Sequence, residues 1–360
     1  MAGQVGRGES AEPLVKEDTA KVDLYSSMSQ APALKTALKR GALIAAANWP
    51  LVVVQFIAES TLKLILGVPV VGGIFLVVLL LDANVEDLLR GDVRDIITAV
   101  VSALRANPAA LTSFALAFLI VLIGGSLLTF VVKGGTVAVL VDADAHAGAI
   151  ERPPLRLQML RRANRTGIDP FLDGCRRLAW RYVKLGVGLL IVYAATAAAY
   201  FGLLFGGYAI ADNVGVLLWW TVIGAAGSSA VIVWITVVNF LYLMTQIVMA
   251  VDDVGLRAAL RTVGRFLRSS VREIAGIFGV VLLLVLLATA ASILATAGLS
   301  LIGFVPIVAV AVMPLQLAAW LVRGIVFQYL ALTALGAYLT QYRHYLGGVA
   351  LAAVPDKRPA

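Results

Sequence analysis

The amino-acid sequence predicts an all-α integral membrane protein, built as a bundle of about six transmembrane helices with amphipathic interfacial helices between some of them. Three observations predict this class. Hydrophobic residues make up 61% of the 360 residues and charged residues only 14%, whereas soluble domains carry about 25% charged residues. Several apolar runs exceed the roughly 20 residues that a helix needs to cross a bilayer. Most charged residues lie between those runs.

The N-terminal third divides into a polar tail, an apolar run and an amphipathic segment. Residues 1–30 have no apolar core, so we expect a disordered cytoplasmic tail and not a signal peptide. Residues 41–81 are almost wholly apolar and predict a span near 41–66, with room for a second crossing or a bent interfacial piece. Residues 82–107 carry five acidic against three basic side chains. We expect this segment outside the cell, because short cytoplasmic loops carry an excess of Lys and Arg.

The remaining apolar runs complete a membrane domain at residues 31–345. They predict spans near 109–132, 185–204, 226–250, 274–297 and 315–341. Uncharged or nearly uncharged turns are expected outside, at 206–215 and 298–303. The surplus apolar residues are expected on the outer side as tilted extensions or re-entrant pieces, near 64–81, 216–225 and 304–314.

Charge bias sets the predicted orientation. Segment 141–184 carries nine basic against five acidic residues, and segment 251–273 carries five arginines against three acids. Both are therefore expected in the cytoplasm, together with a C-terminal tail at 346–360. Six spans with both termini in the cytoplasm satisfy these constraints.

The clearest amphipathic pattern lies between Asp252 and Arg272. Its arginines recur at steps of three or four residues and so share one face of a helix; they are Arg257, Arg261, Arg265, Arg268 and Arg272. Apolar residues occupy the opposite face, and Asp252 and Asp253 stand where a helix N-terminus favours acidic groups. Such a helix lies on an anionic membrane face, so these arginines are the predicted lipid-binding residues. Two alternatives are a role in orientation alone, and pairing with Asp142, Asp144 and Glu151 or with a partner protein.

The segment around this helix resembles a known family. Residues 249–278 read MAVDDVGLRAALRTVGRFLRSSVREIAGIF. They resemble a signature of bacterial six-helix membrane proteins of unassigned activity, the glycerophosphoryl diester phosphodiesterase membrane domain and its relatives. In that group a span ends in an acidic element with a nearby Gly and continues as an A-L-x-R-like helix. Here Arg261 follows Leu260 directly, one place early.

A second element, from Gly134-Gly135 to Asp142, is similar to the Gly-rich span exit of the same group. The resemblance covers about residues 110–345 and implies a polytopic inner-membrane protein. It implies no phosphodiesterase activity, because no catalytic domain accompanies it. The weak likeness between the two exits, 134–165 and 249–272, suggests a duplicated three-span unit.

The sequence offers little chemistry for catalysis or metal binding. It contains one cysteine, Cys175, two histidines, and no HExxH, GxSxG or phosphate-binding loop motif. We therefore expect no enzyme, no catalytic residue, no cofactor and no metal site. The net charge of +8 is better explained by orientation and anionic lipid than by nucleic acid.

Three ionisable residues lie within the apolar runs. Glu59 and Lys63 stand in the i, i+4 order that forms a salt bridge on one helix, which is the favoured interpretation. Ionisable residues in spans also mark transport pathways, which is the alternative. Arg323 is expected to extend to the outer headgroups, with a cavity-lining role as its alternative. The sequence Asn48-Trp49-Pro50 predicts a kink with interhelical hydrogen bonds.

Together these patterns predict a non-enzymatic accessory, scaffold or lipid-interacting protein of the cytoplasmic (inner) membrane. The expected partners are membrane lipids, anionic on the cytoplasmic face, and a membrane-protein partner or a second copy of the chain. The alternative is a component of a small-solute or lipid transporter or channel. A transporter should place polar side chains from several helices in one cavity at mid-bilayer.

Overall fold

A computed structural model describes residues 34–81, 102, 107–152, 154, 157–215, 217–302 and 306–352. The expected tail at 1–30, nearly all of the amphipathic segment 82–107, and residues 353–360 lie outside these residues. Within the described residues every regular element is an α-helix. Six of these helices are long and apolar enough to cross a membrane, so the predicted fold class is confirmed.

The helices follow the order of the predicted spans. They are α2 (Leu34–Ala47), α3 (Trp49–Leu81), α6 (Pro108–His146), α7 (Leu157–Ala163), α8 (Ile168–Val214), α9 (Leu217–Val251), α10 (Leu256–Ser269), α11 (Val271–Ile302) and α12 (Pro306–Ala352). The stretches that could cross a membrane are Trp49–Gly73, Leu111–His146, Ile168–Ala211, Leu218–Val251, Val271–Leu299 and Val312–Val349. Each overlaps one predicted span.

The helix ends differ from the prediction. Residues 41–81 contain one membrane-length helix, because α2 ends before Asn48 and α3 then runs through Pro69. The surplus apolar residues continue α3, α9 and α12 as helix and form no re-entrant piece within the described residues. The predicted turn at 206–215 is helical as far as Val214, and α12 continues seven residues beyond 345. A helix satisfies its own backbone hydrogen bonds, so an apolar segment in a membrane is more stable as a helix than as an irregular turn.

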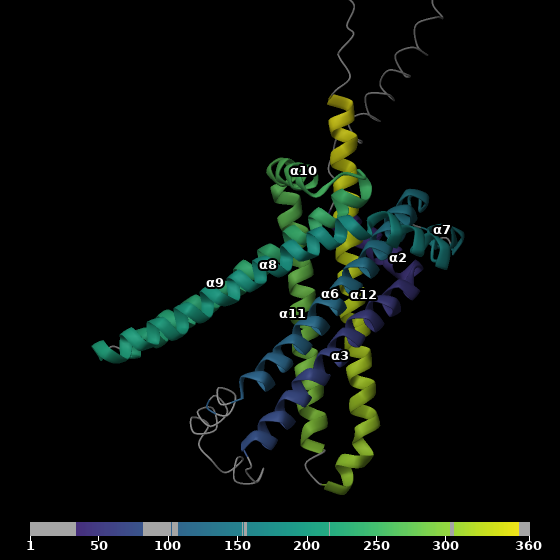
Figure 1. Ribbon diagram of the computed structural model, residues 1–360. Coiled ribbons are helices and arrows are strands. Elements are labelled where there is room, and N and C mark those ends of the chain that lie inside the picture. Colours follow the sequence, from purple (N-terminus) through teal and green to yellow (C-terminus); the bar gives the residue numbers. More distant parts are fainter. Residues whose placement is uncertain are drawn as a thin grey trace, which may run out of the picture.

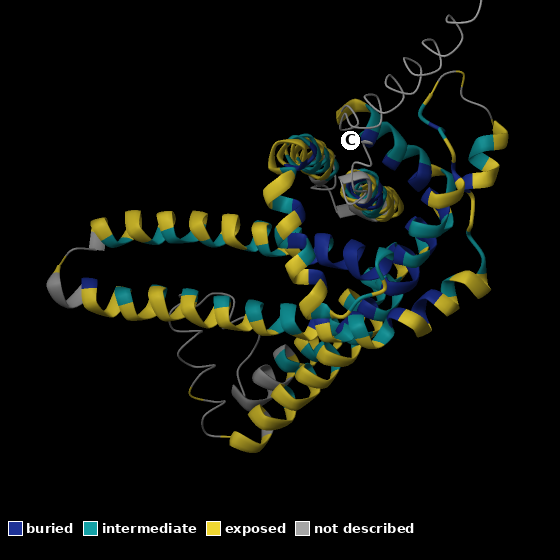
Figure 2. Ribbon diagram, turned by 90° about the horizontal axis from the view of Figure 1, so that it is seen from above, coloured by how far each residue is buried: buried dark blue, intermediate teal, exposed yellow. Residues whose placement is uncertain are grey.

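The membrane-length helices form three hairpins that meet at one end of the molecule, shown in Figure 1. The hairpins are α3 with α6, α8 with α9, and α11 with α12. Away from the meeting point they diverge, and the α8–α9 hairpin extends furthest to the side (Figures 1 and 2). Burial is concentrated where the hairpins meet, whereas their far parts expose large apolar side chains. In the predicted membrane setting those exposed side chains contact lipid.

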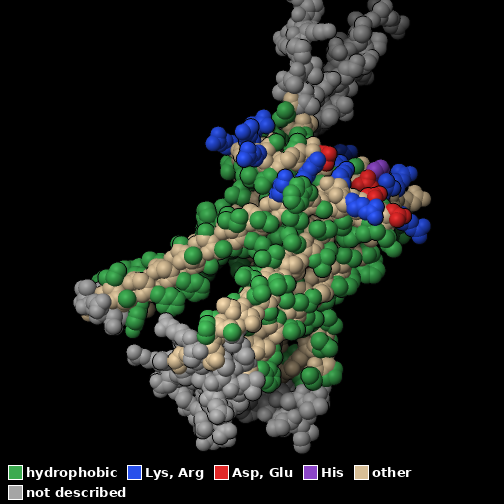
Figure 3. Space-filling model, in the orientation of Figure 1, with side chains coloured by type: hydrophobic (Ala, Val, Ile, Leu, Met, Phe, Trp, Pro, Cys, Tyr) green, Lys and Arg blue, Asp and Glu red, His purple; other side chains and the backbone are tan. Residues whose placement is uncertain are grey.

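Charged side chains gather at the end where the hairpins meet, as Figure 3 shows. We call this the charged end and define it by Arg40, Asp144, Arg181, Asp253 and Arg343, which form ion pairs there.

The two acidic exits occupy equivalent places in this arrangement. Asp142 lies at the end of α6, the second helix of one hairpin, and Asp252 follows α9, the second helix of the next. Each exit leads through a short helix, α7 or α10, into a new hairpin. One two-helix hairpin, α8 with α9, separates the two exits, and this spacing does not fit a three-span unit.

Helices α2 and α12 touch through their backbones. A Cβ atom at Gly336 would lie 2.8 Å from the Cα of Gly41, and one at Gly41 would lie 2.6 Å from the backbone nitrogen of Ala337. Any larger residue at either glycine would push the helices apart. The hydroxyl of Tyr329 also donates a hydrogen bond of 3.1 Å to the carbonyl of Ala42. The first and last described helices are thus joined closely.

Candidate functional site

The predicted basic helix is present, but it is shorter than the arginine pattern suggested. Helix α10 begins after Gly255 and ends at Ser269, so Arg272 belongs to the first turn of α11. The other four arginines share α10, and all five side chains are exposed. Asp252 and Asp253 do not cap α10. Instead Asp252 accepts a hydrogen bond of 2.6 Å from the Tyr342 hydroxyl, and Asp253 pairs with an α8 arginine.

The apolar face of α10 is packed against protein. Ala259, Val263 and Phe266 are buried. The ring of Phe266 lies 5.2 Å, centroid to centroid, from each of the rings of Tyr342 and Tyr345 on α12. The centre of this face therefore contacts α12. The helix lies across the charged end beside α11 (Figure 1) and holds its arginines outward.

The three acids proposed as alternative partners of these arginines are occupied elsewhere. Asp142 pairs with Arg165 at 2.7 Å. Asp144 and Glu151 pair with Arg40 at 2.7 and 2.9 Å. In the described part of the chain, no ion pair reaches an arginine of the basic pattern. These arginines are therefore available to an external anion.

Asp144 is the centre of a junction that the sequence analysis missed. Its side chain is 2% exposed and also binds Arg343 at 3.0 Å, so it joins α2, α6 and α12. Burial alone would lower the pKa of Arg40, but the carboxylates of Asp144 and Glu151 outweigh it and raise that pKa above its ordinary value. The junction is structural in character, since every charged member has a partner.

Asn48 forms a second junction and makes the predicted interhelical hydrogen bond. It separates α2 from α3, and its amide nitrogen donates to the carbonyls of Ile44 and Ala163, both at 2.9 Å. Its amide oxygen accepts bonds of 3.0 Å from the backbone nitrogen of Arg165 and the hydroxyl of Thr166. The buried amide thus ties the start of α3 to the loop between α7 and α8.

Glu59 does not pair with Lys63. Its carboxylate oxygen Oε1 lies 4.0 Å from Nζ of Lys133 on α6, and no ion pair joins Glu59 to Lys63 among the described residues. The i, i+4 prediction is therefore wrong. Lys63 is exposed and takes part in a cavity instead. The favoured structural pair exists, but between two helices and with a different lysine.

That cavity has a volume of about 440 Å³ and lies between α3, α11 and α12. Its polar lining residues come from all three helices; they are Glu59, Ser60, Lys63, Thr289, Arg323 and Gln328. Phe56 and Trp320 supply an aromatic wall, with ring centroids 5.7 Å apart. We call this the polar cavity. Sequence patterns could not reveal it, because its charged residues come from helices more than 250 positions apart.

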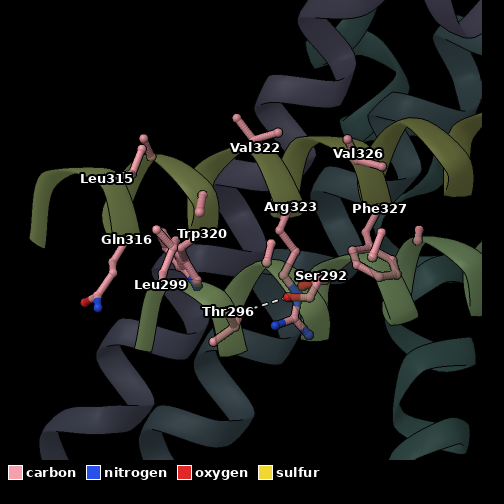
Figure 4. Close-up of a pocket in the computed structure, with 15 residues that line it drawn as sticks. Ser292, Thr296, Leu299, Leu315, Gln316, Trp320, Val322, Arg323, Val326 and Phe327 are labelled. Atoms are coloured by element: carbon pink, nitrogen blue, oxygen red, sulfur yellow. Dashed lines mark hydrogen bonds between the residues drawn. The ribbon is translucent and has the colours of Figure 1, made fainter. Parts of the chain in front are cut away.

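Arg323 lies at the boundary of a second, mostly apolar cavity of about 680 Å³ between α11 and α12. Its guanidinium is directed between the two helices, toward Ser292 and Thr296, as Figure 4 shows. The cavity-lining alternative for Arg323 therefore holds. Several alanines line this space, including Ala288, Ala291 and Ala295. We call it the alanine groove.

The fold and these sites define a multi-pass helical membrane protein. Across the described residues no group of three or more His, Cys, Asp or Glu side chains could hold a metal ion. No family model, no curated protein and no solved structure matches the chain. The resemblance to the glycerophosphoryl diester phosphodiesterase membrane domain therefore stays a prediction.

Proposed function

We propose that this chain is a non-enzymatic accessory or scaffold protein of a bacterial inner membrane that holds anionic lipid through the basic face of α10. One observation carries the proposal. The arginines of α10 are exposed and have no carboxylate partner within the described residues, while the opposite face is fixed to α12. A cation near an anionic leaflet gains about 1 kcal/mol. Because α10 is already folded and fixed, its arginines gain this free energy without the cost of first ordering the helix.

The proposed orientation places the charged end and both termini in the cytoplasm. The excess of Lys and Arg in segments 141–184 and 251–273 supports this orientation. The cytoplasmic leaflet is also the one that carries anionic surface charge to which basic segments bind. In this proposal the chain, as a scaffold, binds either a membrane-protein partner or a second copy of itself.

A second candidate is transport of a small solute or a lipid. The polar cavity favours it, because side chains from three helices meet there in the manner that a pathway requires. Measurement of solute or lipid flux in proteoliposomes would separate this candidate from the first. Flux that is lost on changing Glu59 or Lys63 while the protein stays folded would support transport.

Lipid selectivity of the full-length protein tests the first proposal. The protein is reconstituted in mixed bilayers with spin-labelled phosphatidylglycerol or phosphatidylcholine, and the motionally restricted fraction of each lipid is measured. The wild type should prefer phosphatidylglycerol, and added salt should weaken that preference by screening. Changing Arg261, Arg265 and Arg268 to Gln should lower the preference severalfold.

The matched control removes three exposed arginines from α7 and α8 instead, namely Arg161, Arg162 and Arg176. It lowers the net charge equally but leaves α10 intact, so it should have the smaller effect. Equal effects of the two triple variants, or no lipid preference in the wild type, would contradict the proposal.

A further inference from the structure

The polar cavity and the alanine groove adjoin each other, and together we call them the composite space. They share three lining residues, Trp320, Arg323 and Phe327. Each volume, about 440 and 680 Å³, is within the range of roughly 300–1,000 Å³ typical of ligand pockets. One part is charged and the other is mostly apolar. A ligand that fills both must be amphiphilic.

The charge of the polar cavity favours an anionic ligand. Glu59 has Lys133 as its ionic partner, so its negative charge is already balanced. Lys63 and Arg323 form no ion pair among the described residues. The guanidinium of Arg323 lies 5.8 Å from the ring centroid of Phe327 and is directed toward Ser292 and Thr296 (Figure 4). The charged lining therefore holds two cations and one carboxylate, and that carboxylate also has Lys133 within 4.0 Å, so the cavity carries an excess of positive charge.

The depth of these cations makes their neutralisation important. Lys63 and Arg323 both lie within stretches that could cross a membrane. An unpaired charge in the hydrocarbon region is costly. A bound anionic group removes that cost, and arginine suits a phosphate because its fork of donors matches the oxygen geometry.

The surroundings select a lipid as the source of that anion. Lys63, Arg323 and most residues of the groove are exposed in the structure, and exposure within a membrane span means contact with lipid. We propose that the composite space binds one anionic phospholipid, with its phosphate beside Lys63 and Arg323 in the polar cavity and an acyl chain along the alanine groove. This site lies within the spans, so it goes beyond the lipid contact proposed for α10.

Native mass spectrometry of the full-length protein in detergent tests this site. With phosphatidylglycerol added at low ratio, the wild type and the α10 triple variant should each retain at least one lipid per chain, whereas phosphatidylcholine should not be retained. Changing Lys63 and Arg323 together to Gln should weaken retention about tenfold or more, the effect of losing charge-assisted hydrogen bonds. The control Lys184→Gln removes an exposed cation that stacks on Trp180 outside the cavity and should retain the lipid.

A second pair of variants probes the groove without touching charge. Ala295→Trp fills the alanine groove and should abolish retention, whereas Ala297→Trp, on an exposed position that does not line it, should leave retention unchanged. This pair decides the question if the charge variant does not fold. The α10 triple variant should keep this lipid, which separates this site from the one on α10.

Three results would overturn the inference. The first is equal retention by the wild type and the Lys63 and Arg323 double variant. The second is equal loss with Ala295→Trp and Ala297→Trp. The third is displacement of the lipid by excess glycerol phosphate, which carries the anion but no acyl chain and would show a small-anion site.

Discussion

Changing Asp144 to Asn should destabilise the charged end strongly. The substitution keeps the shape of the side chain but removes the charge that binds Arg40 at 2.7 Å and Arg343 at 3.0 Å. Breaking a buried ion pair costs about 3–5 kcal/mol. Here the partner side chains are 15% and 32% exposed, and Arg40 keeps Glu151, so partial hydration should reduce the cost to about 2–3 kcal/mol.

The free energy of unfolding of the full-length protein in mixed micelles measures this effect. A double-mutant cycle with Arg40→Met isolates the coupling between Asp144 and Arg40. The loss of unfolding free energy in the double variant should be smaller than the sum of the two single losses by about 1–2 kcal/mol. The matched control is Asp142→Asn. Its side chain is 42% exposed and pairs with Arg165 at the same 2.7 Å distance, so it should cost less than about 1 kcal/mol.

Two outcomes would refute this reasoning. The first is additivity of the Asp144 and Arg40 variants within about 0.5 kcal/mol. The second is a loss at Asp142 as large as that at Asp144. In either case burial would not be what gives the Asp144 junction its strength.

Two further predictions concern the spans. Glu59→Gln together with Lys133→Met should be closer to wild type in thermal stability in detergent than either single variant, because the two residues form the ion pair. Glu59→Gln together with Lys63→Met should show no such rescue. Equal rescue by both double variants would contradict the assignment. Reporter fusions near residues 160, 262 and 350 should give cytoplasmic signals and those near 95, 212 and 300 external ones. A cytoplasmic signal near residue 95 would exclude the six-span path.

The fold class and the approximate spans could be predicted because they depend on local composition. A long apolar run specifies a membrane helix by itself, whatever it packs against. Helix ends were less predictable, since the predicted turn at 206–215 is helical as far as Val214 in this chain. Glycine is tolerated in membrane helices more often than in soluble ones, so it is a weaker signal of a turn here.

The partners of individual side chains could not be predicted. Arg40 and Asp144 are 104 residues apart, and no spacing rule connects them. The i, i+4 rule correctly placed Glu59 and Lys63 on neighbouring turns, but a lysine on another helix forms the ion pair. Likewise the amphipathic pattern of α10 identified an apolar face without showing that Tyr342 and Tyr345 cover it.

The contact between α2 and α12 has a consequence for the synthesis of the protein. Ala42 and Tyr329, which are hydrogen-bonded, are separated by 287 residues. Ribosomes add about 5–20 residues per second, so α2 emerges about 15–60 s before its partner helix exists. During that interval Gly41, which packs against Gly336 and Ala337 in the finished molecule, lacks its partner surface. Insertion of the last hairpin therefore completes the bundle, and a nascent chain stopped before α12 would display α2 to cellular quality control.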